Sequence, residues 1–171
     1  MSIFYDNVVR GGAIKELVKG LLEESGYMVA PYGYESTFPQ LRKLIAEKGM
    51  EYSSTARMLK SSPDILVYDD IRRDVMLVEV KMRSAKDPSH VGYLDLERYV
   101  EFWGDSLLAL AVPCGNILYA QRFSDLGVKR SYDVDRDFER FRDVFPRVTE
   151  ETIEHFKPIA LKAMESSTKL S

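Results

Sequence analysis

Two apolar segments joined by a short polar turn constrain the fold of this chain more than any other feature. Residues 64–68 read Asp-Ile-Leu-Val-Tyr, residues 75–82 read Val-Met-Leu-Val-Glu-Val-Lys-Met, and polar residues fill most of positions 69–74. Apolar segments of this length, rich in β-branched residues and bounded by turn residues, are typical of paired strands. We therefore predict a β-hairpin at the centre of the chain.

The segment before the hairpin predicts a helix followed by a strand. Apolar residues at helical spacing predict a helix that starts after Gly11-Gly12 and ends at Gly26. Its apolar stripe consists of Ile14, Leu17, Val18, Leu21 and Leu22. We predict a strand over residues 27–32 with Pro31 at an edge or end, a helix over 39–48, and a loop or short helix over 49–62.

The segment after the hairpin predicts further helices and strands. Asp87-Pro88 favours a helix start. Its apolar face would comprise Tyr93, Leu96, Tyr99, Val100 and Trp103. The apolar run 107–112 predicts a buried central strand, and we predict another strand over 117–123. Helices are expected over 136–145 and 149–164, with Pro158 kinking or splitting the last one.

These elements together predict an α/β fold with a mixed central sheet flanked by helices. A length of 171 residues fits one domain, and no linker rich in proline, glycine or serine divides it. We expect a core over about 11–123 and a C-terminal helical extension over about 136–165.

Composition and charge exclude several classes of protein. No apolar run is long enough to span a bilayer, so no membrane partner is expected, and the N-terminus lacks the pattern of a secretion signal. A single cysteine, Cys114, excludes an internal disulfide and a cysteine zinc site; we expect a reducing, cytoplasmic location with Cys114 as an apolar filler.

The charge pattern leaves two interpretations open. A net charge of -3 counts against a passive nucleic-acid binder, which usually carries a basic excess. Basic residues nevertheless outnumber acidic residues over positions 42–60, whereas acidic residues outnumber basic residues over positions 133–154. Such a division fits one surface that binds a phosphate backbone, and it fits ordinary solvated faces equally well.

One strand of the hairpin carries an acid and a base on the same face. Side chains alternate along a strand, so Glu79 and Lys81 point the same way within an otherwise apolar segment. Burying either charge costs several kcal/mol unless it is paired or bound to a metal. Asp64 begins the neighbouring strand and is expected beside Glu79. A divalent cation would relieve the repulsion of two carboxylates, and oxygen ligands suit Mg²⁺ or Mn²⁺.

These residues resemble the motif of a known family. Ser62-Pro63-Asp64, followed by Val-Glu-Val-Lys at 78–81, resembles the PD-(D/E)xK nucleases, which include restriction enzymes, archaeal junction resolvases and recombination exonucleases. The resemblance covers residues 11 to about 112. It implies a restriction-endonuclease-like core with the element order αβββαβ.

The resemblance also implies a mechanism and partners. Asp64, Glu79 and the backbone carbonyl of Val80 would hold Mg²⁺, for which Mn²⁺ is expected to substitute. Lys81 would orient the attacking water or help to deprotonate it. The chain is then expected to be an endo- or exodeoxyribonuclease that acts on DNA and leaves a 5′-phosphate. A homodimer is an expected assembly because symmetric duplex substrates suit a two-fold partner.

Additional site residues are candidates on this resemblance. The family often supplies another acid from the first helix; the aligned position here holds Ile14, and the nearest acid, Glu16, lies opposite the apolar stripe. Glu35 is a second candidate acid, in a loop. Tyr99 is either a core aromatic or a counterpart of the tyrosine in the Gln-x-x-x-Tyr motif of recombination exonucleases.

Arg83 and Lys86 follow the motif closely and are candidates for phosphate contacts, with a solvated basic loop as the alternative.

Three functions remain open from the sequence. The first is the nuclease. The second is a non-catalytic module on the same fold that binds nucleic acid or protein. The third is an unrelated interaction protein in which Glu79 and Lys81 form a surface ion pair worth less than about 1 kcal/mol.

Overall fold

The structure is a computed structural model that describes residues 3–34, 40, 43, 45, 47–49, 53–83 and 91–165. Its described helices are α1 (Ile3–Glu24), α4 (Ser54–Lys60), α5 (Glu97–Phe102), α6 (Phe123–Leu126), α7 (Val134–Asp137), α8 (Phe141–Val144) and α9 (Glu150–Glu165). Its strands are β1 (Met28–Pro31), β2 (Ile65–Asp69), β3 (Asp74–Met82), β4 (Val91–Gly92), β5 (Leu107–Ala111), β6 (Leu118–Arg122), β7 (Ser131–Tyr132) and β8 (Glu139–Arg140).

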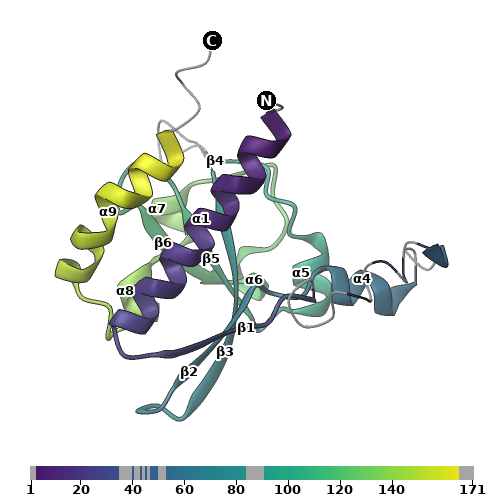
Figure 1. The fold of residues 1–171 in the computed structure, drawn as a ribbon, viewed down its shortest axis with the longest axis horizontal. Coiled ribbons are helices and arrows are strands. Elements are labelled where there is room, and N and C mark those ends of the chain that lie inside the picture. The colour runs from purple at the N-terminus through teal and green to yellow at the C-terminus, as the bar shows by residue number, and fades with distance from the viewer. Residues whose placement is uncertain are drawn as a thin grey trace.

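A six-stranded mixed sheet forms the centre of the molecule (Figure 1). Its strand order is β1-β2-β3-β5-β6-β8, and β4 and β7 form a separate two-stranded sheet. Strands β3 and β5 run parallel, whereas the other pairs described in the sheet are antiparallel. The predicted fold class, α/β with a mixed central sheet flanked by helices, is therefore confirmed.

The central hairpin is confirmed, and its register places the motif residues. Ile65 pairs with Val78 in the antiparallel β2–β3 ladder, so Asp64, immediately before β2, lies across from Glu79. The side chain of Asp69 closes the hairpin turn by accepting hydrogen bonds from the backbone amides of Ile71 and Arg72, at 3.1 and 3.2 Å.

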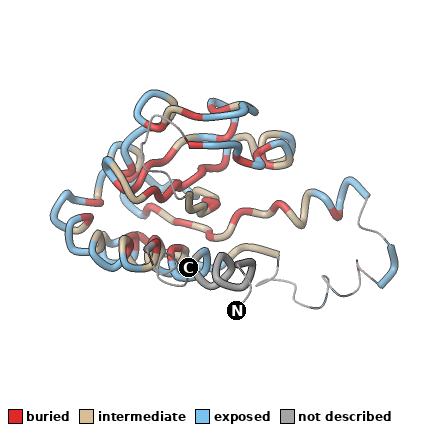
Figure 2. The backbone as a smooth tube through the Cα atoms, turned by 90° about the horizontal axis from the view of Figure 1, so that it is seen from above, coloured by how far each residue is buried: buried red, intermediate tan, exposed pale blue. Residues whose placement is uncertain are grey.

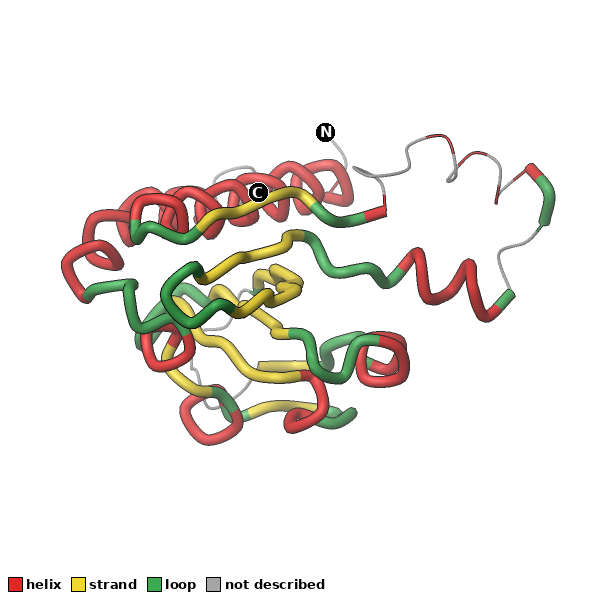
Figure 3. Tube along the Cα trace, turned by 90° about the horizontal axis from the view of Figure 1, so that it is seen from below, coloured by secondary structure: helices red, strands yellow, loops and turns green. Residues whose placement is uncertain are grey.

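Helices α1 and α9 lie side by side on one face of the sheet (Figures 1 and 3). The predicted apolar stripe of α1 packs there: Ile14, Val18, Leu21 and Leu22 are all buried. They belong to one core with Val67, Val78 and other strand residues of that face, and with Ile153, Ala160 and Met164 of α9.

Shorter elements cover the opposite face of β5 and β6, where a second core forms. This core contains Leu108 and Leu110 of β5 together with Tyr99 of α5. The buried positions follow the strands between the two layers, and exposed positions lie on the outer turns (Figure 2). All residues of β5 are buried, as predicted for a central strand. Glu79 and Lys81 of β3 point toward this second layer, where both contact Tyr99.

Helix α1 begins earlier than predicted, at Ile3 rather than after Gly11-Gly12. The two glycines lie within the helix and are exposed, and a methyl group added at either position would meet no atom within 4 Å. The helix therefore continues through these two glycines, and neither of them packs against another element. The described residues include no helix that is both long and apolar enough to span a membrane.

The helix predicted from Asp87 onward is shorter than expected. Residues 84–90 lie outside the described residues, β4 follows, and α5 starts only at Glu97. Leu94 and Leu96 are both fully buried in the irregular segment before α5. Residues two apart lie on nearly opposite sides of a helix, so burial of both does not fit a helix with one apolar face. Most of the helix predicted over 39–48 also lies outside the described residues.

The prediction of a single helix over 136–145 was wrong. Its apolar residues have helical spacing, but Val134 and Phe138 enter the second core, whereas Phe141 and Phe145 enter the first. The chain passes around the edge of the sheet between these pairs as β8, which is hydrogen-bonded to β6. One straight helix cannot serve both faces of a sheet. Helix α9 is confirmed, with Pro158 inside it rather than splitting it.

Candidate active site

Asp64 is fixed through both its backbone and its side chain. Its carbonyl oxygen accepts hydrogen bonds from the backbone amides of Tyr32 and Gly33, at 2.9 and 3.1 Å, which join the end of β1 to the start of β2. Carboxylate oxygen Oδ2 accepts from the backbone amide of Val80 at 3.0 Å. Oxygen Oδ1 accepts from the ammonium group of Lys15 at 2.8 Å. Two strands and α1 therefore hold this carboxylate.

Glu79 is buried in the middle of β3, where only 7% of the residue is exposed. Its Oε1 accepts a hydrogen bond from the hydroxyl of Tyr99 at 2.7 Å and another from the ammonium group of Lys81 at 3.0 Å. The interpretation of Glu79 and Lys81 as a surface ion pair is wrong, because the carboxylate is buried against Tyr99 of α5. A buried ion pair with a further hydrogen bond is costly to form and needs a reason beyond stability.

Burial raises the pKa of Glu79 to about 7. The desolvation of the carboxylate is the main cause, and the negative charge of Asp64 raises the pKa as well. The ammonium group of Lys81 and the hydroxyl of Tyr99 act in the opposite direction but do not compensate fully. Ionisable groups whose pKa is shifted by burial and by a nearby charge are common at functional sites.

The oxygen atoms around this point fit a divalent cation. Because the N–H and C=O of a strand residue point to the same side, the Val80 carbonyl faces the same edge of β3 as the amide that binds Asp64. Two carboxylates and a carbonyl are the hard oxygen donors that Mg²⁺ and Mn²⁺ prefer. Among the described residues, no group of three or more acids, histidines or cysteines is placed to bind a metal. The groups that could hold a cation at this point are the carboxylates of Asp64 and Glu79 and the carbonyl of Val80.

Lys81 lies over the ring of Tyr99, with its nitrogen 4.7 Å from the ring centroid. The same ring stacks on Phe123 at 4.9 Å between centroids. Tyr99 is a residue of the second core, as one of the two alternatives predicted, and its hydroxyl also donates a hydrogen bond to the Glu79 carboxylate. Burial beside that carboxylate raises the pKa of Tyr99, so its hydroxyl remains protonated.

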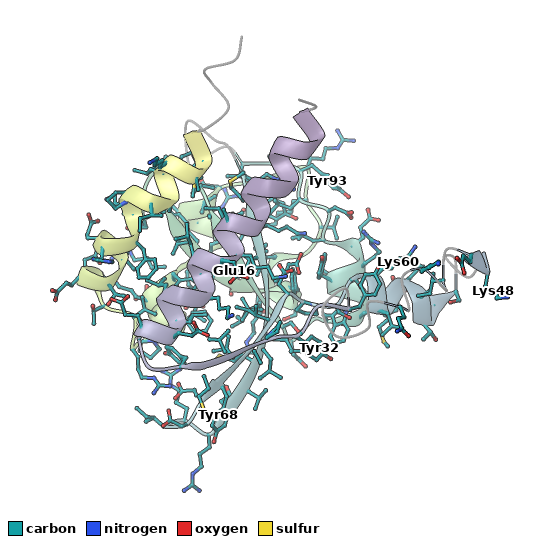
Figure 4. The ribbon with its side chains drawn as sticks, in the orientation of Figure 1. Glu16, Tyr32, Lys48, Lys60, Tyr68 and Tyr93 are labelled. Atoms are coloured by element: carbon teal, nitrogen blue, oxygen red, sulfur yellow. The ribbon has the colours of Figure 1, made fainter. Side chains whose placement is uncertain are left out.

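The structure does not bring all the candidate residues together. Glu16 projects from α1 with 70% of its side chain exposed, and its contact is a 3.9 Å ion pair with Lys19 (Figure 4). Arg83 follows β3, is half-buried and donates from Nη1 to the carbonyl of Met82 at 2.9 Å. Glu35 and Lys86 lie outside the described residues.

Among known proteins, similarity to this chain is found with solved structures. A scan against protein-family models gives no match, and a search of the curated proteins gives none either. The structure is similar to an archaeal Holliday junction resolvase. This protein is Hjc from the hyperthermophile Archaeoglobus fulgidus; the match has 16% identity and a TM-score of 0.43, and covers 80% of this chain and 98% of that one.

Lys15 is the site residue that sequence reasoning missed. It precedes Val18 by three positions and Leu22 by seven, a spacing that places it at the margin of the apolar stripe of α1. A lysine at that margin can lay its stem along the core and extend its charge to the edge of the sheet. The spacing could therefore have indicated that Lys15 reaches the sheet, but it could not identify Asp64 as the partner of Lys15, because Asp64 is distant in sequence.

A hollow of about 600 Å³ lies elsewhere on the surface. It is lined by residues at the opposite end of β3, such as Asp74 and Leu77, and by neighbouring acids that include Asp105 and Glu139. None of Asp64, Glu79 and Lys81 lines it. Its volume therefore gives no reason to move the candidate site away from the two carboxylates.

Replacing Tyr99 with phenylalanine is expected to destabilise the protein more at pH 8 than at pH 5. The hydroxyl lowers the pKa of Glu79 by donating to its ionised form, so its loss matters most above the pKa of about 7. A hydrogen bond to a charged group contributes about 1.5–3 kcal/mol, whereas one to a neutral group contributes about 1 kcal/mol. Urea denaturation at both pH values measures the difference.

Tyr132→Phe is the matched control for this prediction. Tyr132 is also buried, and its hydroxyl donates to the backbone carbonyl of Gly127 at 3.0 Å rather than to a carboxylate. Its loss should have the same cost at both pH values. Equal pH behaviour of the two variants would contradict the role that we assign to the Tyr99 hydroxyl.

Proposed function

We propose that this chain is a divalent-metal-dependent nuclease that hydrolyses phosphodiester bonds of DNA. The observation that carries the proposal is the buried Glu79 carboxylate, which has Lys81 at 3.0 Å and a pKa raised to about 7 partly by Asp64. Ionisable groups whose pKa values are perturbed by burial together with a specific charged partner are typical of catalytic sites. The cation would be Mg²⁺ or Mn²⁺, bound by Asp64, Glu79 and the Val80 carbonyl.

In the proposed mechanism, the residues of the chain bind the cation and position the attacking water. When bound, the cation supplies Lewis-acid stabilisation of charge on the phosphate and lowers the pKa of a bound water. Lys81 extends from β3 beside Glu79, where its ammonium group orients the nucleophile and offsets negative charge at the phosphate. The ring of Tyr99 lies beneath the ammonium group of Lys81, and its hydroxyl holds Oε1 of Glu79 by a hydrogen bond.

The substrate class and setting follow the same proposal. We propose DNA as the partner, in a reducing cytoplasm that suits a chain with one cysteine, and a single domain over residues 1–171. The similar archaeal protein is a Holliday junction resolvase, and branched DNA is therefore included among the substrates to test. A homodimer would present two such sites to the two strands of a duplex.

Replacing Lys81 with methionine is expected to reduce cleavage by about 10²- to 10⁴-fold, because the ammonium group that acts on the nucleophile is lost while much of the aliphatic stem is kept. Linear, supercoiled, single-stranded and branched DNA would each be incubated with Mg²⁺, Mn²⁺ or EDTA. Lys19→Met is the control, since Lys19 lies on α1 and pairs with the exposed Glu16. Cleavage by Lys81→Met at the wild-type rate would exclude this role of Lys81.

A non-catalytic binding module on the same fold is the second candidate. The observation that favours it is that each carboxylate is already paired with a lysine, Asp64 with Lys15 and Glu79 with Lys81. Such a module would retain DNA in EDTA and cleave no substrate with any divalent cation. Metal-dependent cleavage by the wild-type protein would exclude it.

A further inference from the structure

Lys15 occupies the oxygen of Asp64 that the backbone leaves available. Oδ2 is bound by the amide of Val80, and Oδ1 accepts from the Lys15 ammonium at 2.8 Å. The lysine comes from α1, whereas Asp64 and Val80 come from the sheet, so this contact crosses from the helical layer to the strands. About a quarter of each of the two side chains is exposed, 26% for Lys15 and 24% for Asp64. Water and ions can therefore reach the pair.

We propose that Lys15 is the resting counterion of Asp64, which a divalent cation must displace, so that this lysine sets the metal concentration that the site requires. The inference rests on the proposed metal site and adds a regulatory residue to it. In this scheme Lys15 acts through Asp64 and does not contact the substrate.

Simple electrostatics gives the direction of the effect. An ammonium group and a metal ion use the same carboxylate lone pairs and repel each other at short distance, so each must weaken the binding of the other. A lysine is suited to leaving, because its stem is flexible and its ammonium group is readily hydrated by solvent. Lys81 is less free to leave its carboxylate, since it also lies over the ring of Tyr99.

A purely structural role for Lys15 predicts the opposite sign. If the ion pair merely held Asp64 in position, its removal would loosen the carboxylate and weaken metal binding. If the ion pair competes with the metal, its removal strengthens metal binding. The sign of the change in affinity, measured without any substrate, therefore separates the two roles.

The test is calorimetric titration of the DNA-free, full-length chain with MnCl₂ at pH 8. Lys15→Met should bind Mn²⁺ about ten-fold more tightly than the wild type, because methionine keeps much of the aliphatic stem and removes the charge. Lys15→Arg should restore an affinity close to that of the wild type. Lys19→Met is the matched control, since Lys19 is on the same helix with 29% of its side chain exposed. It should leave Mn²⁺ affinity unchanged.

Three results would overturn the inference. Lys15→Met could bind Mn²⁺ equally or more weakly, Lys19→Met could strengthen binding as much as Lys15→Met, or neither the wild type nor Lys15→Met could bind Mn²⁺ at all. A cleavage assay of the wild type separates this inference from the proposed function. Metal-dependent cleavage without tighter binding by Lys15→Met would reject the counterion role alone. Tighter binding by Lys15→Met with no cleavage by the wild type would support the counterion role and reject the nuclease.

Discussion

Replacing Asp64 with asparagine is expected to reduce metal-dependent DNA cleavage by on the order of a thousand-fold while the fold is retained. The amide oxygen of asparagine can still accept the hydrogen bond from the Val80 amide, and the backbone bonds from Tyr32 and Gly33 do not involve the side chain. What is lost is the negative charge that would bind the cation. The substitution therefore separates chemistry from architecture.

The measurement is the initial rate of cleavage of the best substrate, with circular dichroism as the check on folding. Glu16→Gln is the control, because it removes one negative charge from an exposed side chain of α1. This variant should cleave at the wild-type rate. An Asp64→Asn protein that retains activity within a few-fold of the wild type would remove Asp64 from the site.

Replacing Glu79 with glutamine is expected to stabilise the protein above pH 7 and to abolish its activity. The folded protein favours the protonated glutamic acid, with a pKa of about 7 against an ordinary value of 4.5. The stability that this preference contributes is fully present below about pH 4.5 and is lost as the pH rises to about 7. These pKa values differ by about 2.5, which corresponds to about 3 kcal/mol at about 1.4 kcal/mol per pH unit.

Glutamine is neutral throughout this range and avoids the cost of burying a charge. The unfolding free energy of Glu79→Gln minus that of the wild type should therefore rise between pH 4.5 and pH 7 and then remain constant. Urea denaturation in metal-free buffer at about pH 4.5, 5.5, 7 and 8 measures the difference. A constant difference for Glu79→Gln would contradict the cost that we assign to the buried carboxylate.

The opposite effects on stability and activity are the reason to keep Glu79 ionisable. A buried carboxylate destabilises the protein near neutral pH, but in the proposed site it would provide a charged ligand for a cation. Functional sites are often places where stability is sacrificed in this way.

The sequence predicted most of the central architecture. Alternation along residues 75–82 placed Glu79 and Lys81 on one face, and the hairpin placed Asp64 opposite Glu79; the β2–β3 register confirms both. These predictions succeeded because strand periodicity and a short turn are local properties, set by residues close together in the chain. The apolar stripe of α1 was predicted for the same reason.

The elements that were predicted wrongly are those whose conformation depends on distant partners. The spacing of Val134, Phe138, Phe141 and Phe145 is helical, yet the chain divides them between two cores on opposite faces of the sheet. The start of α5 was also mistaken, because Leu94 and Leu96 are both buried and cannot share the one apolar face of a helix. Hydrophobic spacing alone does not reveal which layer a residue will enter.

The sequence by itself determined the two carboxylates, the lysine on the strand of Glu79 and the mixed sheet that carries them. These features depend on local periodicity. Only the tertiary structure decided the burial and the charge pairing of these residues. It buried Glu79 under Tyr99, 20 positions away, and brought Lys15 to Asp64 across 49 positions. Burial and charge pairing are properties of packed layers, and so the raised pKa of Glu79 and the counterion of Asp64 emerge only when α1 and α5 close on the sheet.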